Sequence, residues 1–357
     1  MKHFYTLLLL ISISFYAFPQ QAYYNGIDFD NLSGSDLKDA LATRIISTHT
    51  NPLNYIWEAC QNTDLDPMNN SNVLLIYGWE NGTDGDVTND LYRDVNNNGG
   101  SVGDWNREHT YPNSLGTPKL ETGGKNMTSY SDAHNLRASD VQRNGQRGNK
   151  KFAAGSGNSK TVNGGTDWYP GDEWRGDVAR VIMYMYLRYD SQCLPSNVSN
   201  GNTNALDSNM IDLLLYWNEA DKVSAYEDAR NTYHTSGDTY SQGNRNPFID
   251  QPYLANMIWG IPAGQNAAED RWNLLSINEY PLSSVKIYPN PLKNDYLNIK
   301  TKTSLSIEIY NVLGKRVLTN KVDAHNKTIN VSSLAKGVYL VKLSSKNGST
   351  TKKLVKQ

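Results

Sequence analysis

The sequence predicts an α+β fold, in which a mainly helical domain is followed by a small all-β sandwich. Apolar residues recur with helical spacing at several places before residue 260, whereas short alternating apolar and polar runs replace them from Val285 onward. A chain of 357 residues suits one large domain and one smaller one. With 38% hydrophobic and 10% aromatic residues, the chain has enough apolar side chains for a core, which excludes a disordered protein.

The N-terminus has the pattern of an export signal. Lys2 and His3 precede an apolar run over residues 6–18, which Pro19 interrupts. This run is too short to cross a membrane as a helix, and no other stretch approaches the required length. We therefore predict a signal peptide over residues 1–20 and a protein that is secreted, either extracellular or at the cell surface, with no transmembrane segment.

The large domain is expected over residues 21–267, and a linker over 268–283. Its predicted elements, in order, are a helix over 35–47, a buried strand over 73–77, a loop over 81–104, a core helix over 174–189, a second helix over 206–217 and a third helix opened by a capping box of Ser224 and Glu227. Apolar residues surround the helix over 174–189 on nearly all sides, as in a central core helix.

Residues 284–357 are expected to form the sandwich, from about seven short strands. Runs such as 305–310 and 338–343 alternate apolar with polar residues. From Val285 to the end there are 14 Lys+Arg and 3 Asp+Glu, whereas the rest of the chain has 20 and 33. Because the lysines alternate with apolar residues along the strands, we place them on a solvent-exposed face and do not interpret them as a DNA-binding surface.

Cys60 and Cys193 are the only cysteines. An exported protein meets an oxidising environment, so a single disulfide is one expectation. Two separate thiols are the other, because distance along the chain says nothing about distance in space. The two cysteines do not have the short spacing of a zinc site.

Residues suited to phosphate chemistry gather in three segments, 104–110, 131–137 and 143–149. Two histidines there titrate near neutral pH and could act as a base. A glutamate and several asparagines offer the oxygen ligands that Mg²⁺ and Ca²⁺ prefer, and four arginines offer planar forks for phosphate oxygens. Residues 105–151 hold 8 Lys+Arg against 4 Asp+Glu, which indicates a local anion site in an acidic domain. Hydrolysis of a phosphodiester needs this combination of base, metal and guanidinium.

Spacing alone leaves the individual roles open. Glu108 and His109 are adjacent, so on an ideal strand they point to opposite faces and share a site only at an irregular strand end. Glu108 could otherwise be a surface carboxylate, and for His134 we favour a hydrogen-bonded core histidine. His49 and His234 have no recognisable partners.

Two further acidic segments are weaker signals. The stretch Asp94-x-Asn96-x-Asn98-Gly99 imitates the start of a calcium loop, but its twelfth position is Trp105, so we favour a turn. We also do not expect Asp84, Asp86 and Asp90 to hold a structural Ca²⁺.

Three motifs resemble the signature of the bacterial endonuclease I family, which comprises secreted or periplasmic nucleases with a ββα-metal (His-Me finger) site. They are Asn106-Arg107-Glu108-His109, Asp132-x-His134-Asn135-Leu136 and Asn144-x-x-Arg147-x-Asn149. Further similar motifs follow the same order along the chain, at 23–24, 176–180, 227–231 and 242–250, so the resemblance spans roughly residues 23–260.

This resemblance implies a role for each site residue. His109 would be the general base that activates water, and Glu108 and Asn144 would hold one Mg²⁺, with Ca²⁺ or Mn²⁺ as substitutes. Arg107, Arg143 and Arg147 would contact phosphate. Family members cut DNA, and often RNA, with little sequence preference and leave 5′-phosphate ends. The periplasmic branch has a further arginine after the histidine, but residues 110–131 hold only lysines at 119 and 125, which leaves the leaving-group stabiliser unidentified.

Residues 284–357 are similar to the type IX secretion C-terminal sorting domain of Bacteroidota. The motifs that carry this similarity are 285–291, 309–315, 334–342 and the ending 352–357. The similarity implies that the type IX secretion machinery is a partner.

We therefore predict a secreted, nonspecific endonuclease for DNA and RNA that acts as a monomer. The first alternative is an extracellular ribonuclease with a preference for RNA, because single-strand tolerance depends on groove shape. The second is an inactive nucleic-acid-binding or adhesion module at the cell surface. The presence of Glu108, His109 and Asn144 argues against this second alternative.

Overall fold

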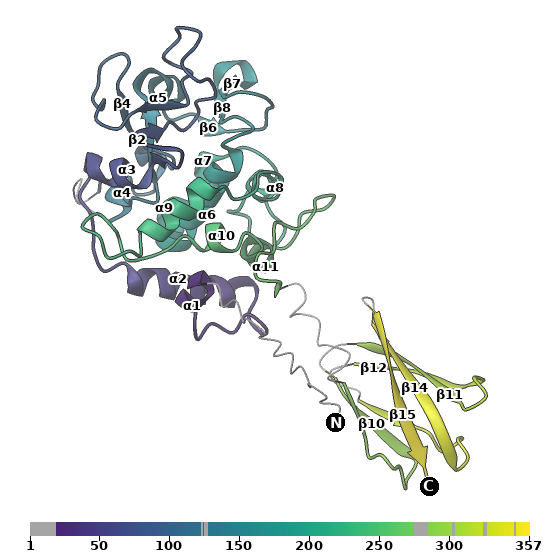
Figure 1. The fold of residues 1–357 in the computed structure, drawn as a ribbon. Coiled ribbons are helices and arrows are strands. Elements are labelled where there is room, and N and C mark those ends of the chain that lie inside the picture. The colour runs from purple at the N-terminus through teal and green to yellow at the C-terminus, as the bar shows by residue number, and fades with distance from the viewer. Residues whose placement is uncertain are drawn as a thin grey trace, which may run out of the picture. The chain divides into compact units, whose positions relative to one another are not determined.

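The computed structural model describes residues 19–122, 124, 128–274, 285–301, 304–323, 327–345 and 348–357. The chain divides into two compact units, Met1–Trp272 and Asn273–Gln357 (Figure 1). Most of the predicted signal peptide (1–20) and of the predicted linker (268–283) lies outside the described residues, so these boundaries stay predictions. Within the described residues, no helix combines the length and apolar composition needed to cross a membrane.

The first unit mixes helices and strands. Its helices are α1 (Pro19–Tyr23), α2 (Gly34–Thr48), α3 (Trp57–Thr63), α4 (Thr128–Ser131), α5 (Val141–Arg147), α6 (Arg175–Tyr189), α7 (Pro195–Val198), α8 (Asp212–Ala220), α9 (Ala225–Tyr233), α10 (Pro247–Asp250) and α11 (Leu254–Trp259), with 3₁₀ turns η1 (Asn113–Leu115), η2 (Asn163–Gly165) and η3 (Asp190–Cys193). The buried helix α6 is central, since α2, α7, α8 and α10 all contact it.

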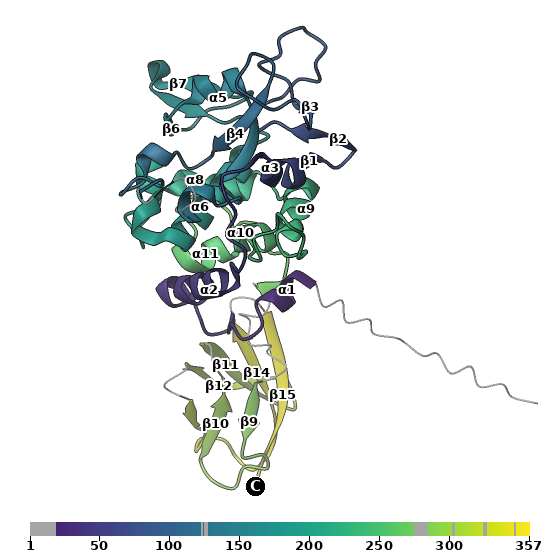
Figure 2. The same ribbon diagram turned by 90° about the vertical axis from the view of Figure 1, so that its left-hand side faces the viewer.

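Three small sheets lie at the end of this unit opposite α1, α2 and α11 (Figures 1 and 2). Their strand orders are β1-β2-β3, β4-β5 and β6-β8-β7. The strands are β1 (Leu65–Asp66), β2 (Asn69–Leu74), β3 (Tyr92–Asp94), β4 (Trp105–His109), β5 (Leu136–Asp140), β6 (Lys151–Phe152), β7 (Lys160–Val162) and β8 (Asp167–Tyr169).

Most predicted elements are present, but two have different bounds. The helices predicted over 35–47 and 174–189 are confirmed as α2 and α6, and the capping box of Ser224 and Glu227 opens α9. The helix predicted from residue 206 begins only at Asp212, because the Asn204 side chain accepts hydrogen bonds from the backbone of residues 206 and 207 and holds a turn there. The strand predicted over 73–77 is β2, which begins earlier, at Asn69, and ends at Leu74.

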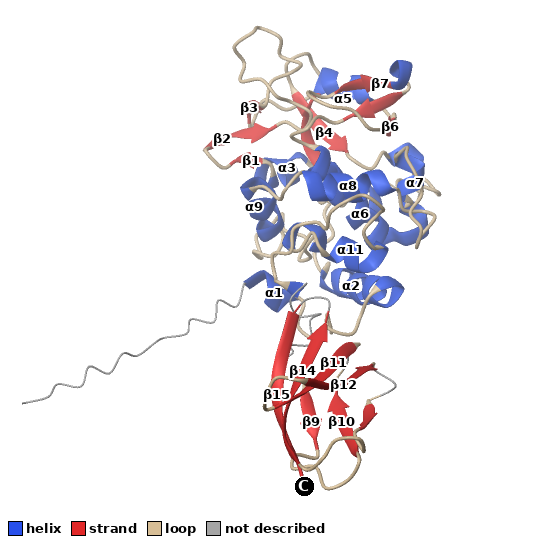
Figure 3. Ribbon diagram, turned by 90° about the vertical axis from the view of Figure 1, so that its right-hand side faces the viewer, coloured by secondary structure: helices blue, strands red, loops and turns tan. Residues whose placement is uncertain are grey.

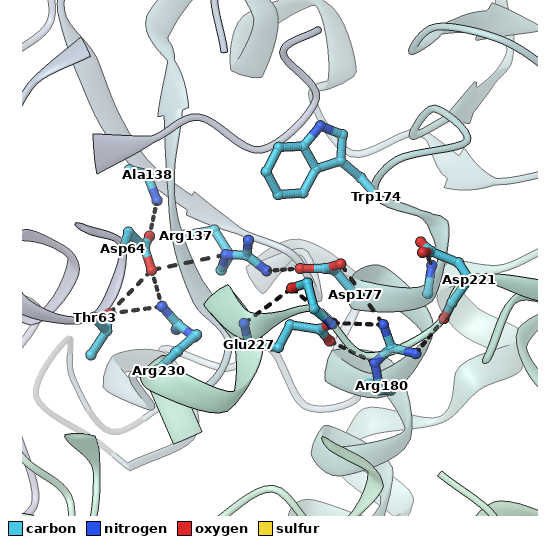
Figure 4. Close-up of polar contacts among 12 residues, drawn as sticks. Thr63, Asp64, Arg137, Ala138, Trp174, Asp177, Arg180, Asp221, Glu227 and Arg230 are labelled. Atoms are coloured by element: carbon cyan, nitrogen blue, oxygen red, sulfur yellow. Dashed lines mark hydrogen bonds and ion pairs between the residues drawn. The ribbon is translucent and has the colours of Figure 1, made fainter. Parts of the chain in front are cut away.

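Buried ion pairs join β5 to the helices (Figure 4). Arg137 of β5 donates to Asp177 of α6 at 3.0 Å. Arg180 of α6 makes two hydrogen bonds with the Glu227 carboxylate of α9, at 2.6 and 2.8 Å. On the other side of Arg137, Arg230 of α9 contacts Asp64. Because each charge is compensated only while these elements keep their places, the network fixes the position of β5 against α6 and α9.

Over its described residues, the second unit has seven strands, which form the expected sandwich (Figure 3). One sheet has the order β13-β10-β9 and the other β12-β11-β14-β15, and both contribute side chains to one buried core. The strands are β9 (Lys286–Tyr288), β10 (Tyr296–Lys300), β11 (Leu305–Asn311), β12 (Arg316–Val322), β13 (Thr328–Asn330), β14 (Gly337–Ser345) and β15 (Gly348–Lys356). Every lysine with a described side chain in this unit is at least partly exposed, as predicted.

Candidate active site

Two antiparallel strands and a helix carry the predicted site residues. β4 pairs with β5, and α5 follows β5 without a loop. The turn from strand to helix depends on Asp140, whose carboxylate accepts hydrogen bonds from the backbone N–H groups of Gln142 and Arg143, both at 2.8 Å. This N-cap satisfies two of the free donors at the start of α5. Arg93 at 2.7 Å compensates the capping charge, and α5 contacts both strands.

One face of β4 is directed toward α5. The Asn144 side-chain amide donates to the Asn106 side-chain oxygen at 2.7 Å, and Arg147 lies 3.2 Å from Oε1 of Glu108. Glu108 is only 3% exposed, so it is not a surface carboxylate, which was the alternative interpretation of the sequence. Burial raises the pKa of Glu108, while Arg147 and a hydrogen bond from Tyr77 lower it. Glu108 and Asn144 therefore both lie where β4 meets α5, Glu108 through its contact with Arg147 and Asn144 through its contact with Asn106.

The other face of β4 carries Arg107 and His109. The His109 ring stacks on Tyr55 with centroids 5.1 Å apart, and the Arg107 guanidinium lies 3.8 Å from the ring centroids of both Tyr55 and Trp57. Glu108 and His109 thus point to opposite faces, as on a regular strand. The two side chains can act on one phosphate only at the end of β4, where His109 is the last residue.

The His109 imidazole has one ring nitrogen bonded to the backbone and one left free. Its Nε2 lies 2.7 Å from the backbone oxygen of Tyr130. A carbonyl can only accept a hydrogen bond, so Nε2 carries the hydrogen and Nδ1 keeps a free lone pair. Burial is the main cause that lowers the pKa of His109 to about 4; the nearby Arg107 and Arg147 contribute to this lowering, and the hydrogen bond to the Tyr130 carbonyl opposes it. The imidazole is therefore unprotonated at neutral pH, although the residue is partly exposed.

The three predicted phosphate-binding arginines differ in accessibility. Arg107 is partly exposed. Arg143 is 8% exposed, stacks over Trp79 and donates to the Thr88 carbonyl at 3.2 Å. Arg147 is 1% exposed, and its guanidinium donates to the Thr110 carbonyl at 2.9 Å in addition to its contact with Glu108. Arg107 is thus the most open of the three to a substrate, and Arg147 the least.

His134 and the two cysteines lie in the core. His134 is 1% exposed, its Nε2 lies 3.1 Å from the Asn244 backbone oxygen, and its ring contacts that of His234, which confirms the interpretation as a core histidine. Cys60 and Cys193 are buried free thiols, so the disulfide that the sequence left open is not formed.

Sequence reasoning missed Tyr77, which it assigned only to a strand. Tyr77 is fully buried, has a φ of 75° and donates a hydrogen bond from its hydroxyl to Oε1 of Glu108 at 2.9 Å. Bulky residues rarely adopt a positive φ, so no sequence pattern announces this conformation. Asn106 was quoted only as part of a motif, but its side-chain oxygen lies at the same interface as Asn144.

The donor set at the β4–α5 interface fits a magnesium ion. Mg²⁺ keeps several waters and takes few protein oxygens, commonly from one or two carboxylates. Glu108 supplies a carboxylate, and Asn144 uses its NH₂ group toward Asn106, which leaves its amide oxygen free to face a cation. Within the part of the chain that the structure describes, no three His, Cys, Asp or Glu side chains form a metal cluster. A site here would thus combine one carboxylate with neutral amide oxygens.

Comparison with known proteins places the chain among nucleases. The endonuclease I family profile matches residues 33–253, and the secretion system C-terminal sorting domain profile matches residues 286–357. An extracellular ribonuclease of Bacillus amyloliquefaciens is 41% identical over 237 residues, which cover 64% of this chain and 75% of that protein. An extracellular ribonuclease of Bacillus subtilis is 39% identical over 247 residues, covering 66% and 78%.

These features together define a secreted nuclease, an enzyme that hydrolyses phosphodiester bonds and is exported with a sorting domain. The chain belongs to the endonuclease I family. Enzymes of this family generally depend on a divalent metal ion. The sorting domain implies the secretion machinery as a partner and a location outside the cell or at its surface.

Proposed function

We propose that the protein is a nonspecific endonuclease that hydrolyses both DNA and RNA with one divalent metal ion and His109 as the general base, and leaves 5′-phosphate ends. The observation that carries this proposal is the end of β4, where His109 on one face is a neutral imidazole bonded through Nε2 to the Tyr130 carbonyl, and the oxygen donors Glu108 and Asn144 lie where the opposite face meets α5. A base and a metal site at one strand end are what attack of water on a phosphodiester requires.

In this proposal each side chain has a defined task. Nδ1 of His109 takes a proton from the attacking water, while the Tyr130 carbonyl holds the Nε2 hydrogen and stabilises the imidazolium that forms. Glu108 and Asn144 would hold the metal ion, for which we propose Mg²⁺ with Mn²⁺ or Ca²⁺ as substitutes. When bound, the cation supplies positive charge opposite the scissile phosphate and the leaving oxygen.

The substrate is held by positive charge close to that strand end. Arg107 is the first candidate for a phosphate contact, because it is partly exposed on the His109 face. Arg143 would bind a neighbouring phosphate once its side chain turns away from Trp79. We propose that the protein works as a monomer and that residues 284–357 serve export rather than cleavage.

A ribonuclease with a preference for RNA is a second candidate. Its support is that both relatives described above are named extracellular ribonucleases. Groove shape decides between single-stranded RNA and duplex DNA, and the chemistry of the site residues is the same for both substrates.

The test is cleavage of plasmid DNA and of a long RNA by the purified full-length protein, with Mg²⁺ and with excess chelator. Cleavage of both substrates, lost in chelator, and products with 5′-phosphate ends support the proposal. Cleavage of RNA with DNA untouched supports the second candidate. Undiminished cleavage of both substrates in chelator contradicts the metal-dependent mechanism.

A further inference from the structure

The chain makes an unusual turn at Tyr77, directly after the first three-stranded sheet. The backbone N–H of Ile76 still bonds the Ala138 carbonyl of β5 at 2.9 Å, and the Gly78 N–H then closes a turn on the Leu75 carbonyl at 3.0 Å. Between them Tyr77 has a φ of 75°. A bulky side chain in this region is strained, and such strain persists only where the surroundings over-determine it.

Three contacts hold the Tyr77 side chain and backbone in place. Its ring packs edge-on against Trp168 with centroids 5.5 Å apart, and its carbonyl accepts a hydrogen bond from the Ser159 hydroxyl at 2.7 Å. The phenol hydroxyl then donates to Oε1 of Glu108 at 2.9 Å. The strained turn therefore holds the Tyr77 hydroxyl as a fixed hydrogen-bond donor to one oxygen of the Glu108 carboxylate.

Arg147 approaches the same oxygen from α5. Its Nη1 lies 3.2 Å from Oε1 of Glu108, while Nη2 donates to the Thr110 carbonyl at 2.9 Å. Its guanidinium also lies 4.7 Å from the ring centroid of Phe152, so the side chain has little freedom to swing toward a substrate. The hydrogen bond from Tyr77 and the ion pair with Arg147 thus meet at Oε1, and Oε2 receives no hydrogen bond from any described residue.

We propose that Tyr77 and Arg147 are positioning residues, which fix Oε1 of Glu108 and thereby reserve Oε2 for the metal ion. This inference rests on the proposed function, in which Glu108 is a ligand. It gives Arg147 a different role from the phosphate contact that the sequence motif implies. Residues that orient a metal ligand commonly change metal affinity by about 10- to 100-fold when they are removed.

The test is calorimetric titration of the full-length protein with Mn²⁺, in wild type and in Tyr77→Phe. The variant keeps the ring and loses only the hydroxyl, so we expect Mn²⁺ to bind at least about tenfold more weakly. At saturating Mn²⁺ its kcat should return close to the wild-type value, because His109 and Arg107 are untouched. Wild-type Mn²⁺ affinity in Tyr77→Phe would overturn the proposal.

The chain offers a matched control in which a tyrosine, an arginine and a carboxylate meet elsewhere. The Tyr24 hydroxyl donates to Asp250 at 2.7 Å, and Arg245 holds that carboxylate with two hydrogen bonds, at 2.8 and 2.7 Å. Tyr24→Phe therefore loses an equally buried bond between a hydroxyl and a carboxylate. Tyr24 directly follows α1, which lies away from β4 and α5 (Figures 1 and 2). It should bind Mn²⁺ as the wild type does, and an equal loss of affinity in both variants would reduce Tyr77 to a structural role and overturn the proposal.

Two more variants separate this inference from the proposed function. Glu108→Ala should abolish Mn²⁺ binding, and if it binds normally, the ligand assignment itself fails. If Glu108→Ala abolishes binding while Tyr77→Phe leaves it unchanged, only the positioning role fails. Should Tyr77→Phe not fold, Arg147→Lys tests the same role, because a single ammonium cannot serve both Glu108 and the Thr110 carbonyl. We expect weaker Mn²⁺ binding there too, and unchanged binding would overturn the proposal.

Discussion

Replacing Arg230 with methionine should lower the free energy of unfolding of the nuclease unit by about 3–5 kcal/mol, the usual effect of breaking a buried ion pair. Arg230 and Asp64, which contact each other (Figure 4), are 2% and 0% exposed. Arg230 also donates to the carbonyls of Ala133 and Leu136. After the substitution, Arg137 at 3.9 Å is the one arginine left beside Asp64 among the described residues. The two carbonyls also lose a charged donor, which adds to the loss.

The assay is urea unfolding of the full-length protein followed by tryptophan fluorescence. All 8 tryptophans precede Asn273, so the signal reports the nuclease unit alone. If the same unit is instead unfolded by heat, each kcal/mol lost should lower its melting temperature by roughly 2–4 °C. The transition midpoint should move with little change in its steepness.

The control is Arg271→Met, which breaks an ion pair with Asp228 on the same helix, α9. These two side chains are 25% and 31% exposed, and their nitrogen–oxygen distance is 2.7 Å. A solvent-accessible pair contributes about 0–1 kcal/mol. If both variants lose the same stability, or if Arg230→Met loses less than about 1 kcal/mol, the reasoning about the buried network is wrong.

Three further predictions concern pH, metal and salt. Burial lowers the pKa of His134 to about 4 and that of His234 well below 6.5, so the unfolded chain binds more protons than the folded chain below pH 6.5. Urea unfolding should therefore show that the free energy of unfolding falls from pH 7 to pH 4, and that it falls less steeply in His234→Gln. Equal pH slopes in the two proteins would refute this. Glu108→Ala and Asn144→Ala should both lose activity, and excess Mg²⁺ should restore activity to Asn144→Ala alone, because that variant keeps the charged ligand Glu108. Metal titration curves like the wild type's would exclude both residues as ligands. Deleting residues 284–357 should leave unchanged the slope of the logarithm of DNA affinity against the logarithm of salt concentration. A slope that flattens by several units would instead show that the lysine-rich unit binds DNA.

Local patterns in the sequence were sufficient for much of the fold. Helical spacing predicted α2 and α6, the pair Ser224 and Glu227 predicted the start of α9, and alternation predicted the strands of the second unit. Each of these signals lies within one element, where propensity and periodicity act. The predicted start of α8 was wrong because a single side chain, Asn204, holds the preceding residues in a turn.

The site required contacts between distant segments, which no local pattern carries. The motifs pointed to Glu108, His109 and Asn144, but they did not indicate that Glu108 is buried or that it faces α5 while His109 faces Tyr55. Arg147 looked like a phosphate ligand in the sequence, and its burial follows only from the packing of α5 on β4.

The central claim is that His109 is the base, and the most direct test is the cleavage rate of His109→Ala at saturating Mg²⁺ on RNA and on plasmid DNA. The variant should still fold and should keep the wild-type Mn²⁺ affinity, since the imidazole faces away from Glu108 and Asn144. Its rate should fall by about 10²–10⁴-fold on either substrate, because only the general base is lost. A variant that folds and binds metal normally, yet keeps more than about a tenth of the wild-type rate, would contradict the account.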